Sequence, residues 1–333
     1  MSLRIIGSGW VTPVGRTQAE VISRVKENLP AIPTQPEGYE TPVLPIDASL
    51  ITDVSGLPRL RRSSVISHFA VAAALDALAG LSLREDELAS LPILFLAGDG
   101  SVVYTRRFYQ DIVTRGPGSG SPLLFPETVY NAPASHVAAA LGLKDEALTF
   151  VGDGAAALAA LDSVRALVHS REQKRCLVIA AQELDRINAS AYLRWGLSRD
   201  LLPSEGAGAL LLDSSVEDRG IVFTHGGYSF GSNPDALSKL TRILQSIPPK
   251  CVPHACISSM AGSNVAAVER EAIKKVFPEI SFVSSGPFFG ESLAASTMQQ
   301  VILAHHLVAC GEYGRVLVAS AGYHGQVCAT VLA

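Results

Sequence analysis

Short apolar runs alternate along this chain with longer segments that have the period of a helix. The runs are rich in Val, Ile and Leu and are bounded by turn residues, which is typical of strands buried on both faces. The longer segments are rich in Ala and repeat their apolar residues with helical spacing. This alternation predicts an α/β fold. The predicted strands are Arg4–Gly9, Ile93–Asp99, Ala147–Gly152, Cys176–Glu183, Ala207–Asp213, Ile221–Tyr228, Val252–Ser259, Ser281–Ser285, Arg315–Ala321 and Val327–Leu332. The predicted helices lie near Thr17–Asn28, Val65–Leu78, Ala155–Ser170, Ala236–Ser246, Val265–Val276 and Ser292–Cys310.

The ten predicted strands form two similar series of five, with helices between them. The series meet near Ser214–Gly220, so we expect an internal duplication, with one half at residues 1–214 and the other at residues 215–333. The helix that follows Gly154 contains only Ala and Leu from residue 155 to residue 161. Because this stretch has no polar stripe, we expect the helix to be buried on nearly all sides.

The composition limits the class of protein. The 333 residues include 27 Lys and Arg against 31 Asp and Glu, so the net charge is −4, which excludes nucleic-acid binding by bulk positive charge. Charged residues make up 17% of the chain, below the roughly 25% usual for soluble domains, so much of the chain is expected to be interior or interface. No apolar stretch approaches the roughly 18 residues needed to cross a bilayer, and the N-terminus lacks the apolar core of a signal peptide. We therefore expect a cytoplasmic protein with no membrane span.

The cysteines do not indicate a metal site. They are five in number, form no CxxC pair and lie mostly in apolar runs, so we expect reduced, buried thiols. Cys251, His254 and Cys256 are residue types that bind zinc. Period-two alternation, however, places Cys251 on the opposite strand face from the other two, and no fourth ligand is near. We expect neither a metal ion nor another cofactor.

A GxSxG match at residues 227–231 follows a predicted strand and precedes a helix, which is the context of a hydrolase nucleophile elbow. Ser229 would be the nucleophile. An acid and a histidine later in the chain would complete the hydrolase triad in the order Ser, acid, His. The candidates are Asp235, Glu269, Glu291, His305, His306 and His324. The simpler interpretation is the glycine-rich end of a strand, since patterns of five residues recur by chance.

Segments spread over the whole chain carry a resemblance to a known family. Residues 4–15 are similar to its opening strand and turn, and residues 204–209 contain its Glu-Gly-Ala-Gly-Ala loop, which is the most specific local signal. Phe125-Pro126 with residues 131–134, and residues 226–229 with Asp235-Ala236, are similar to two further segments. The chain thus resembles the β-ketoacyl-ACP synthases, the thiolase-fold condensing enzymes of fatty acid and polyketide synthesis. The resemblance implies a thiolase-like fold of two duplicated α/β halves in α-β-α-β-α layers, with Ser229 in a structural strand.

The resemblance also indicates where the catalytic groups of the family fall. The family carries the acyl chain on a cysteine thiolate at a helix N-terminus, and two histidines polarise the malonyl carbonyl through their N–H groups. The cysteine motif falls on residues 149–156 and puts Gly154 at the nucleophile. The first histidine motif puts Ala261 at its histidine; the second puts Gly286 at its lysine and Glu291 at its histidine. A glycine cannot form a thioester, so the resemblance implies a homologue without the family's catalytic set.

The expected function is therefore that of a catalytically silent, chain-length-factor-like subunit. Its partner would be an active ketosynthase, or a second copy of itself, joined edge to edge at strand Cys176–Gln182. Arg61 and Arg62 match a position where relatives present basic groups to the acyl carrier protein. Large aromatic side chains would shape the acyl pocket or its gate; these are Phe125, Phe288, Phe289 and Tyr323.

A second hypothesis keeps the fold and changes the chemistry. Asp153, Glu291 and His324 would act in a remodelled pocket of an acyltransferase or another acyl-thioester enzyme. Glu291 would serve as a base if burial raised its pKa. A glutamate packed beside a helix N-terminus is the structural alternative.

Overall fold

All ten predicted strands are present in the computed structural model of the chain, which describes residues 3–170, 174–194, 202–214, 221–229, 235–258, 264–323 and 325–333. The strand ends differ from the predicted ends by a few residues at most. The strands are β1 Arg4–Val11, β2 Ile93–Ala97, β3 Ala147–Val151, β4 Arg175–Gln182, β5 Gly206–Asp213, β6 Ile221–Ser229, β7 Ala255–Ser258, β8 Ser281–Ser284, β9 Val316–Ala321 and β10 Val327–Leu332.

The sheet consists of two five-stranded parts with the same internal order. The first part runs β3-β2-β4-β5-β1 and the second runs β8-β7-β9-β10-β6. In the first part β2 pairs in parallel with β3 and β4, and in the second part β7 pairs in parallel with β8 and β9. The other pairs within each part are antiparallel. Among the described residues, the strands of the two parts pair where Arg4 and Ile5 of β1 meet residues 222 and 221 of β6. The predicted boundary at residues 214 and 215 borders residues 215–220, which lie outside the described residues.

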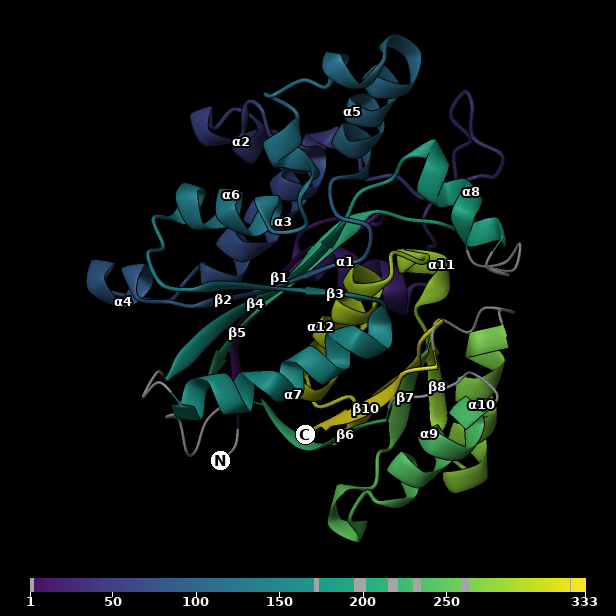
Figure 1. Cartoon of the computed structure of the whole chain (residues 1–333). Coiled ribbons are helices and arrows are strands. Elements are labelled where there is room, and N and C mark those ends of the chain that lie inside the picture. Colours follow the sequence, from purple (N-terminus) through teal and green to yellow (C-terminus); the bar gives the residue numbers. More distant parts are fainter. Residues whose placement is uncertain are drawn as a thin grey trace.

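Helices cover both parts and fill the space between them (Figure 1). Helix α3 packs on β1, β4 and β5 and carries α6, whereas α9 and α10 pack on the strands of the second part. Helices α7 and α12 contact each other and strands of both parts, so they form the middle layer. The helices are α1 Gln18–Lys26, α2 Thr52–Ser55, α3 Val65–Leu78, α4 Glu85–Ala89, α5 Val102–Arg115, α6 Ala132–Leu141, α7 Gly154–Ser170, α8 Arg186–Arg194, α9 Ala236–Gln245, α10 Asn264–Val276, α11 Gly286–Phe289 and α12 Ala294–Ala309. These layers are the predicted α-β-α-β-α arrangement.

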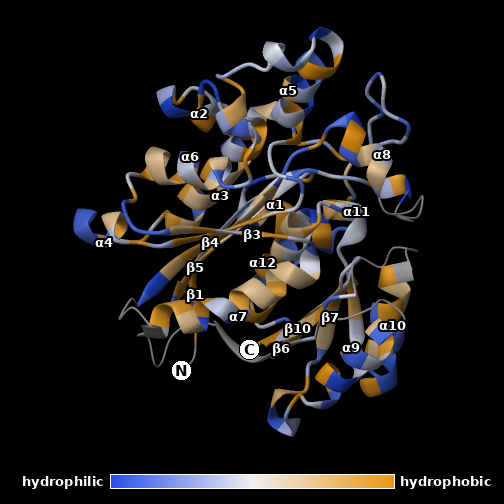
Figure 2. Cartoon of the chain, in the orientation of Figure 1, coloured by the Kyte–Doolittle hydropathy of each residue, from blue (hydrophilic) through white to orange (hydrophobic). Residues whose placement is uncertain are grey.

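The middle layer is largely buried. In α12, thirteen of the residues from Ala294 to Leu307 are buried, and the first two turns of α7 are mostly buried as predicted. Figure 2 shows these two helices and the strands beside them mostly in the colours of apolar residues, whereas α4 at the edge is hydrophilic. A helix that meets sheets on two sides has almost no solvated face, which explains why the first two turns of α7 have no polar stripe, whereas its C-terminal half exposes Ser163 and Ala166.

Two glycines of β1 let α3 approach the sheet closely. A Cβ atom on Gly7 would overlap the carbonyl oxygen of Ala77, and one on Gly9 would lie 2.6 Å from the Ala77 nitrogen. Because backbone atoms cannot move aside as a flexible side chain can, any larger residue at these positions would push α3 away from β1. The opening glycines of the chain are therefore explained by helix packing.

The structure corrects two sequence expectations. Strand β4, which contains Cys176–Gln182, pairs with β2 on one side and β5 on the other, so the prediction that it forms a joining edge is wrong. The free edge of the first part is β3. Helices α2, α4, α5, α6, α8 and α11 were not predicted. Helix α5 buries none of its side chains completely, so it has no apolar stripe to predict it. Helix α6 has Pro133 in its first turn, where proline is tolerated in a helix but interrupts the helical pattern of the sequence.

No helix within the described ranges combines the length and the apolar character that a bilayer span needs.

Candidate functional site

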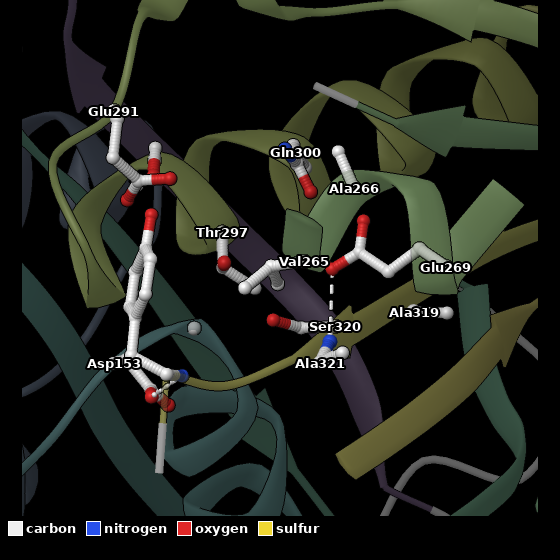
Figure 3. Close-up of a pocket in the computed structure, with 13 residues that line it drawn as sticks. Asp153, Val265, Ala266, Glu269, Glu291, Thr297, Gln300, Ala319, Ser320 and Ala321 are labelled. Atoms are coloured by element: carbon white, nitrogen blue, oxygen red, sulfur yellow. Dashed lines mark hydrogen bonds between the residues drawn. The ribbon is translucent and has the colours of Figure 1, made fainter. Parts of the chain in front are cut away.

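A small pocket lies where the N-terminus of α7 meets α10, α12 and the end of β9 (Figure 3). Its volume is about 30 Å³, which is room for about one water molecule. Carboxyl, hydroxyl and amide groups dominate its lining. The lining residues are Asp153, Gly154, Val265, Ala266, Glu269, Glu291, Ser296, Thr297, Gln300, Ala319, Ser320, Ala321 and Tyr323.

Asp153 holds the first turn of α7. Its Oδ1 accepts the backbone N–H groups of Ala155 and Ala156, at 3.1 and 3.3 Å, and its Oδ2 accepts that of Tyr323 at 2.9 Å. The side chain is 6% exposed. A carboxylate that caps a helix and accepts three backbone N–H groups has little capacity left for catalysis, because its lone pairs are already engaged.

Gly154 begins α7 and faces α12 across the pocket. A Cβ atom at this position would overlap the hydroxyl oxygen of Thr297 and would lie 2.8 Å from Oγ of Ser320. The backbone of Gly154 has an ordinary conformation, so glycine is required here by lack of space and not by its dihedral angles.

Glu291 reaches the pocket from the segment between α11 and α12. Its Oε1 accepts the backbone N–H of Leu293 at 2.6 Å and the hydroxyl of Ser296 at 3.3 Å. Burial raises the pKa of Glu291 to about 7, opposed by these hydrogen bonds and assisted by the nearby charge of Asp153. Leu293 has a φ of 54°, a strained conformation for a residue with a side chain. The carboxylate thus fixes an unusual backbone turn at the start of α12.

Glu269 lies on α10 and is fully enclosed, with Oε1 accepting the backbone N–H of Ala321 at 2.8 Å (Figure 3). Burial raises the pKa of Glu269 to about 8, with smaller contributions from the charges of Glu291 and Asp153. Glu269 was predicted from the sequence only as an acid partner for Ser229. Its place in this pocket depends on how α10 packs against β9, which no local pattern encodes.

Tyr323 lies beside these acids, packed with Tyr192 and Leu293 in a small apolar cluster. Burial, followed by the charge of Glu291, raises the pKa of the Tyr323 hydroxyl far above its ordinary value, so it stays protonated. Of the aromatic residues predicted to shape a pocket, only Tyr323 lines this one. Phe288 and Phe289 are buried in α11, where the Phe289 ring lies 5.9 Å from that of Trp10.

The remaining predicted residues lie elsewhere. Phe125 is 57% exposed and packs against Phe108 on α5. Gly286 begins α11 and is buried. Arg61 and Arg62 are exposed just before α3. Ala261 and His324 lie outside the described residues.

Ser229 ends β6, paired with Val327 of β10. One of its candidate histidines, His306, is engaged by other residues. His305 and His306 lie on α12, where His306 Nδ1 is 2.6 Å from the amide nitrogen of Gln18 and its ring packs edge-on to Trp10. Burial lowers the pKa of His306 to about 3, so it is neutral near pH 7.

The described residues contain no group of three or more His, Cys, Asp or Glu side chains arranged to hold a metal ion. Cys251 and Cys256 are buried, and burial raises the pKa of the Cys256 thiol beyond the range of ordinary thiols. His254 Nε2 lies 2.8 Å from a guanidinium nitrogen of Arg315.

Solved structures share this fold over the whole chain. The ishigamide ketosynthase/chain length factor superposes with a TM-score of 0.84 at 18% identity, covering 100% of this chain and 99% of that one. A β-ketoacyl synthase from Burkholderia phymatum STM815 gives 0.82 at 15% identity, with 99% and 98% covered. A chain from the AntDE:AntF complex, a type II polyketide acyl-carrier protein with its ketosynthase bound to the hexaketide, gives 0.81 at 17%, again with 99% and 98% covered. No protein-family profile and no curated protein matches the sequence.

These likenesses confirm the predicted thiolase-like ketosynthase fold. At such low identity they establish the fold alone.

Proposed function

We propose that this chain is a non-catalytic, chain-length-factor-like partner of a cysteine-bearing ketosynthase in the synthesis of a fatty acid, polyketide or polyene. One observation carries the proposal: the helix whose N-terminus should present the acyl-carrying thiol begins instead at Gly154. A glycine has no group to acylate. None of the five cysteines replaces it, because none lines the pocket.

The other catalytic positions support the same interpretation. Glu291 stands where the second histidine of the family is expected, and Gly286 stands at the preceding lysine. Decarboxylation of a malonyl group needs N–H donors at the developing oxyanion. With its pKa raised to about 7, Glu291 is ionised in a large fraction of molecules near neutral pH, and an ionised carboxylate donates no hydrogen bond and repels that charge. Glu291 is therefore a poor replacement for the histidine.

The edge of β3 is the proposed contact with the partner. Its sequence, Ala147–Val151, contains no charge, and Val151 is 51% exposed. Long exposed edges without charges invite pairing with another strand. Strand β3 also leads directly into Gly154, so a partner at this edge would lie close to the pocket (Figure 1).

Arg59, Arg61 and Arg62 are the proposed contact with an acyl carrier protein. All three are exposed within four residues of one another, on a chain whose net charge is negative. A small cationic cluster would steer an acidic carrier domain to this surface, mainly by raising the association rate.

The test is co-expression with the ketosynthase encoded nearest to this chain, followed by size-exclusion with light scattering and intact mass after incubation with an acyl donor. We expect a stable one-to-one heterodimer in which only the partner's cysteine is acylated. A homodimer of this chain that does not bind the co-expressed ketosynthase would contradict the proposal.

A second candidate function is an acyl-thioester enzyme with altered chemistry. It is favoured by Glu269 and Glu291, two carboxyls in one pocket whose pKa values lie near the working pH of a general base. Turnover of acyl thioesters by the isolated chain, abolished in Glu291→Gln, would support it. If the isolated chain turns over no acyl thioester and the heterodimer is functional, the second candidate function is excluded and the non-catalytic partner function is supported.

A further inference from the structure

Thr297 and Gly154 both line the pocket, and they lie so close together that no room is left for a side chain between them. Thr297 lies in the first turn of α12, and its hydroxyl oxygen stands where a Cβ atom on residue 154 would have to be. The Thr297 Cβ would be only 3.2 Å from that atom. Any side chain at residue 154 therefore competes first with Thr297.

Thr297 cannot easily turn away. Its Cβ carries two heavy atoms, so rotation about χ1 in a helix mainly exchanges the hydroxyl for the methyl group. The neighbouring helix positions are also buried, which leaves no open direction for a shift of α12. Ser320, the second contact at 2.8 Å, differs in this respect because its single hydroxyl can rotate.

We propose that Thr297 fills the volume that a nucleophile on residue 154 would need, so that residues 154 and 297 together keep this pocket closed to acyl transfer. The inference rests on the proposed silent function and deepens it, because the silent state then depends on two matched positions. A cysteine restored at residue 154 alone would not restore a reactive thiol. Thr297 thus determines what the pocket admits, although it takes part in no reaction.

The remaining volume agrees with this assignment. A cavity of about 30 Å³ accommodates one water molecule but not the methylenes of an acyl chain. The polar lining, with Gln300 and three carboxyl groups, offers such a water several hydrogen-bond partners.

The first experiment is a double-mutant cycle with Gly154→Ala and Thr297→Ala, with thermal unfolding as the readout. Alanine favours a helix over glycine, so Gly154→Ala would raise stability if there were space for its methyl group. We expect it instead to lower Tm by at least about 4 °C, and we expect Thr297→Ala to recover most of that loss. Gly56→Ala is the matched control, because a Cβ atom there meets nothing within 4 Å. Additive changes in Tm would overturn the proposal.

The second experiment measures thiol reactivity in a Cys310→Ser background, which removes the one exposed cysteine of the chain. Alkylation of Gly154→Cys by iodoacetamide under native conditions is followed by intact mass. We expect the rate to rise at least tenfold when Thr297→Ala is added, and to rise far less with Ser320→Ala. Equal rates with and without Thr297→Ala would overturn the proposal.

Both readouts use the chain alone. If heterodimer formation fails while the cycle shows coupling, the silent-subunit function is wrong and the assignment of Thr297 stands. If the cycle is additive while the heterodimer forms, Gly154 alone accounts for the missing thioester.

Discussion

The carboxylate of Asp153 accepts the backbone N–H of Tyr323 at 2.9 Å and so ties the first turn of α7 to the segment that follows β9. These residues belong to different halves of the chain. The same carboxylate caps α7 through Ala155 and Ala156. Asp153 is therefore a structural link across the pocket, and this role explains its burial without any catalytic step.

Replacement of Asp153 by Ala should destabilise the fold. Three backbone N–H groups lose their acceptor, and we expect the free energy of unfolding in urea to fall by about 3 kcal/mol. Asp153→Asn keeps one acceptor oxygen for α7 but turns an amide donor toward Tyr323, so its loss should be smaller. A change below about 0.5 kcal/mol in Asp153→Ala would contradict the structural role.

Stability should decline toward alkaline pH because of buried carboxyl groups. Burial raises the pKa of Glu205 to about 7, Glu269 to about 8 and Glu291 to about 7, from an ordinary value of 4.5. The folded state therefore holds these protons more tightly than the unfolded state. Their contribution to stability is complete below pH 4.5 and is lost as the pH rises through 7 to 8, on the order of 1 kcal/mol per pH unit for each group.

Glu269→Gln tests this pH dependence, because its amide oxygen can still accept the N–H of Ala321. We expect a shallower loss of stability between pH 6 and pH 9, measured by urea unfolding at each pH. Glu271→Gln is the matched control, since Glu271 lies on the same helix and is exposed. Parallel curves for wild type and Glu269→Gln would show that Glu269 does not titrate in this range.

A charge at the edge of β3 should weaken the proposed heterodimer. Lysine on an edge strand is a common means of preventing edge pairing. We expect Val151→Lys to raise the dissociation constant at least tenfold, measured by light scattering over a dilution series. Ser281→Lys places the same charge on an exposed residue of β8, the free edge of the second part, and should change little. Equal effects of the two variants would exclude β3 as the contact.

Charge reversal at Arg61 and Arg62 should weaken binding of the carrier protein. We expect the double change to Glu to lower the association rate about tenfold at low salt, with a smaller difference at high salt. Surface plasmon resonance with the carrier protein of the same gene cluster measures both rates. Lys274→Glu with Lys275→Glu is the control, because it reverses two adjacent exposed charges on α10.

Local sequence determines the strands well and the peripheral helices poorly. Strands such as β2, β4, β5, β9 and β10 are apolar runs buried on both faces, so their signal is contained in a few neighbouring residues. Helix α5 lacks such a signal because none of its residues is buried outright. The prediction of β4 as an edge failed for another reason: pairing order depends on contacts between distant strands, and a run such as Cys176–Gln182 is equally apolar at an edge or at the centre.

Some residues of the candidate site could be predicted from the sequence and others could not. Asp153, Gly154, Glu291 and Tyr323 were predicted from the motifs of a resembling family, and all four line the pocket. Thr297 and Ser320 were not predicted, because nothing in their own segments distinguishes them from other buried hydroxyl residues. Their significance arises only when α12 and β9 pack beside residue 154.

The pairing of β1 with β5 has a consequence for the order in which the chain acquires structure during its synthesis. Arg4 pairs with Asp213 and Val11 with Ala207, so β1 cannot complete this ladder until residue 213 has left the ribosome. Contacts of such long sequence separation slow folding and leave strand edges exposed for longer. A nascent chain of this protein is therefore expected to keep this edge of β1 unpaired until β5 has been made.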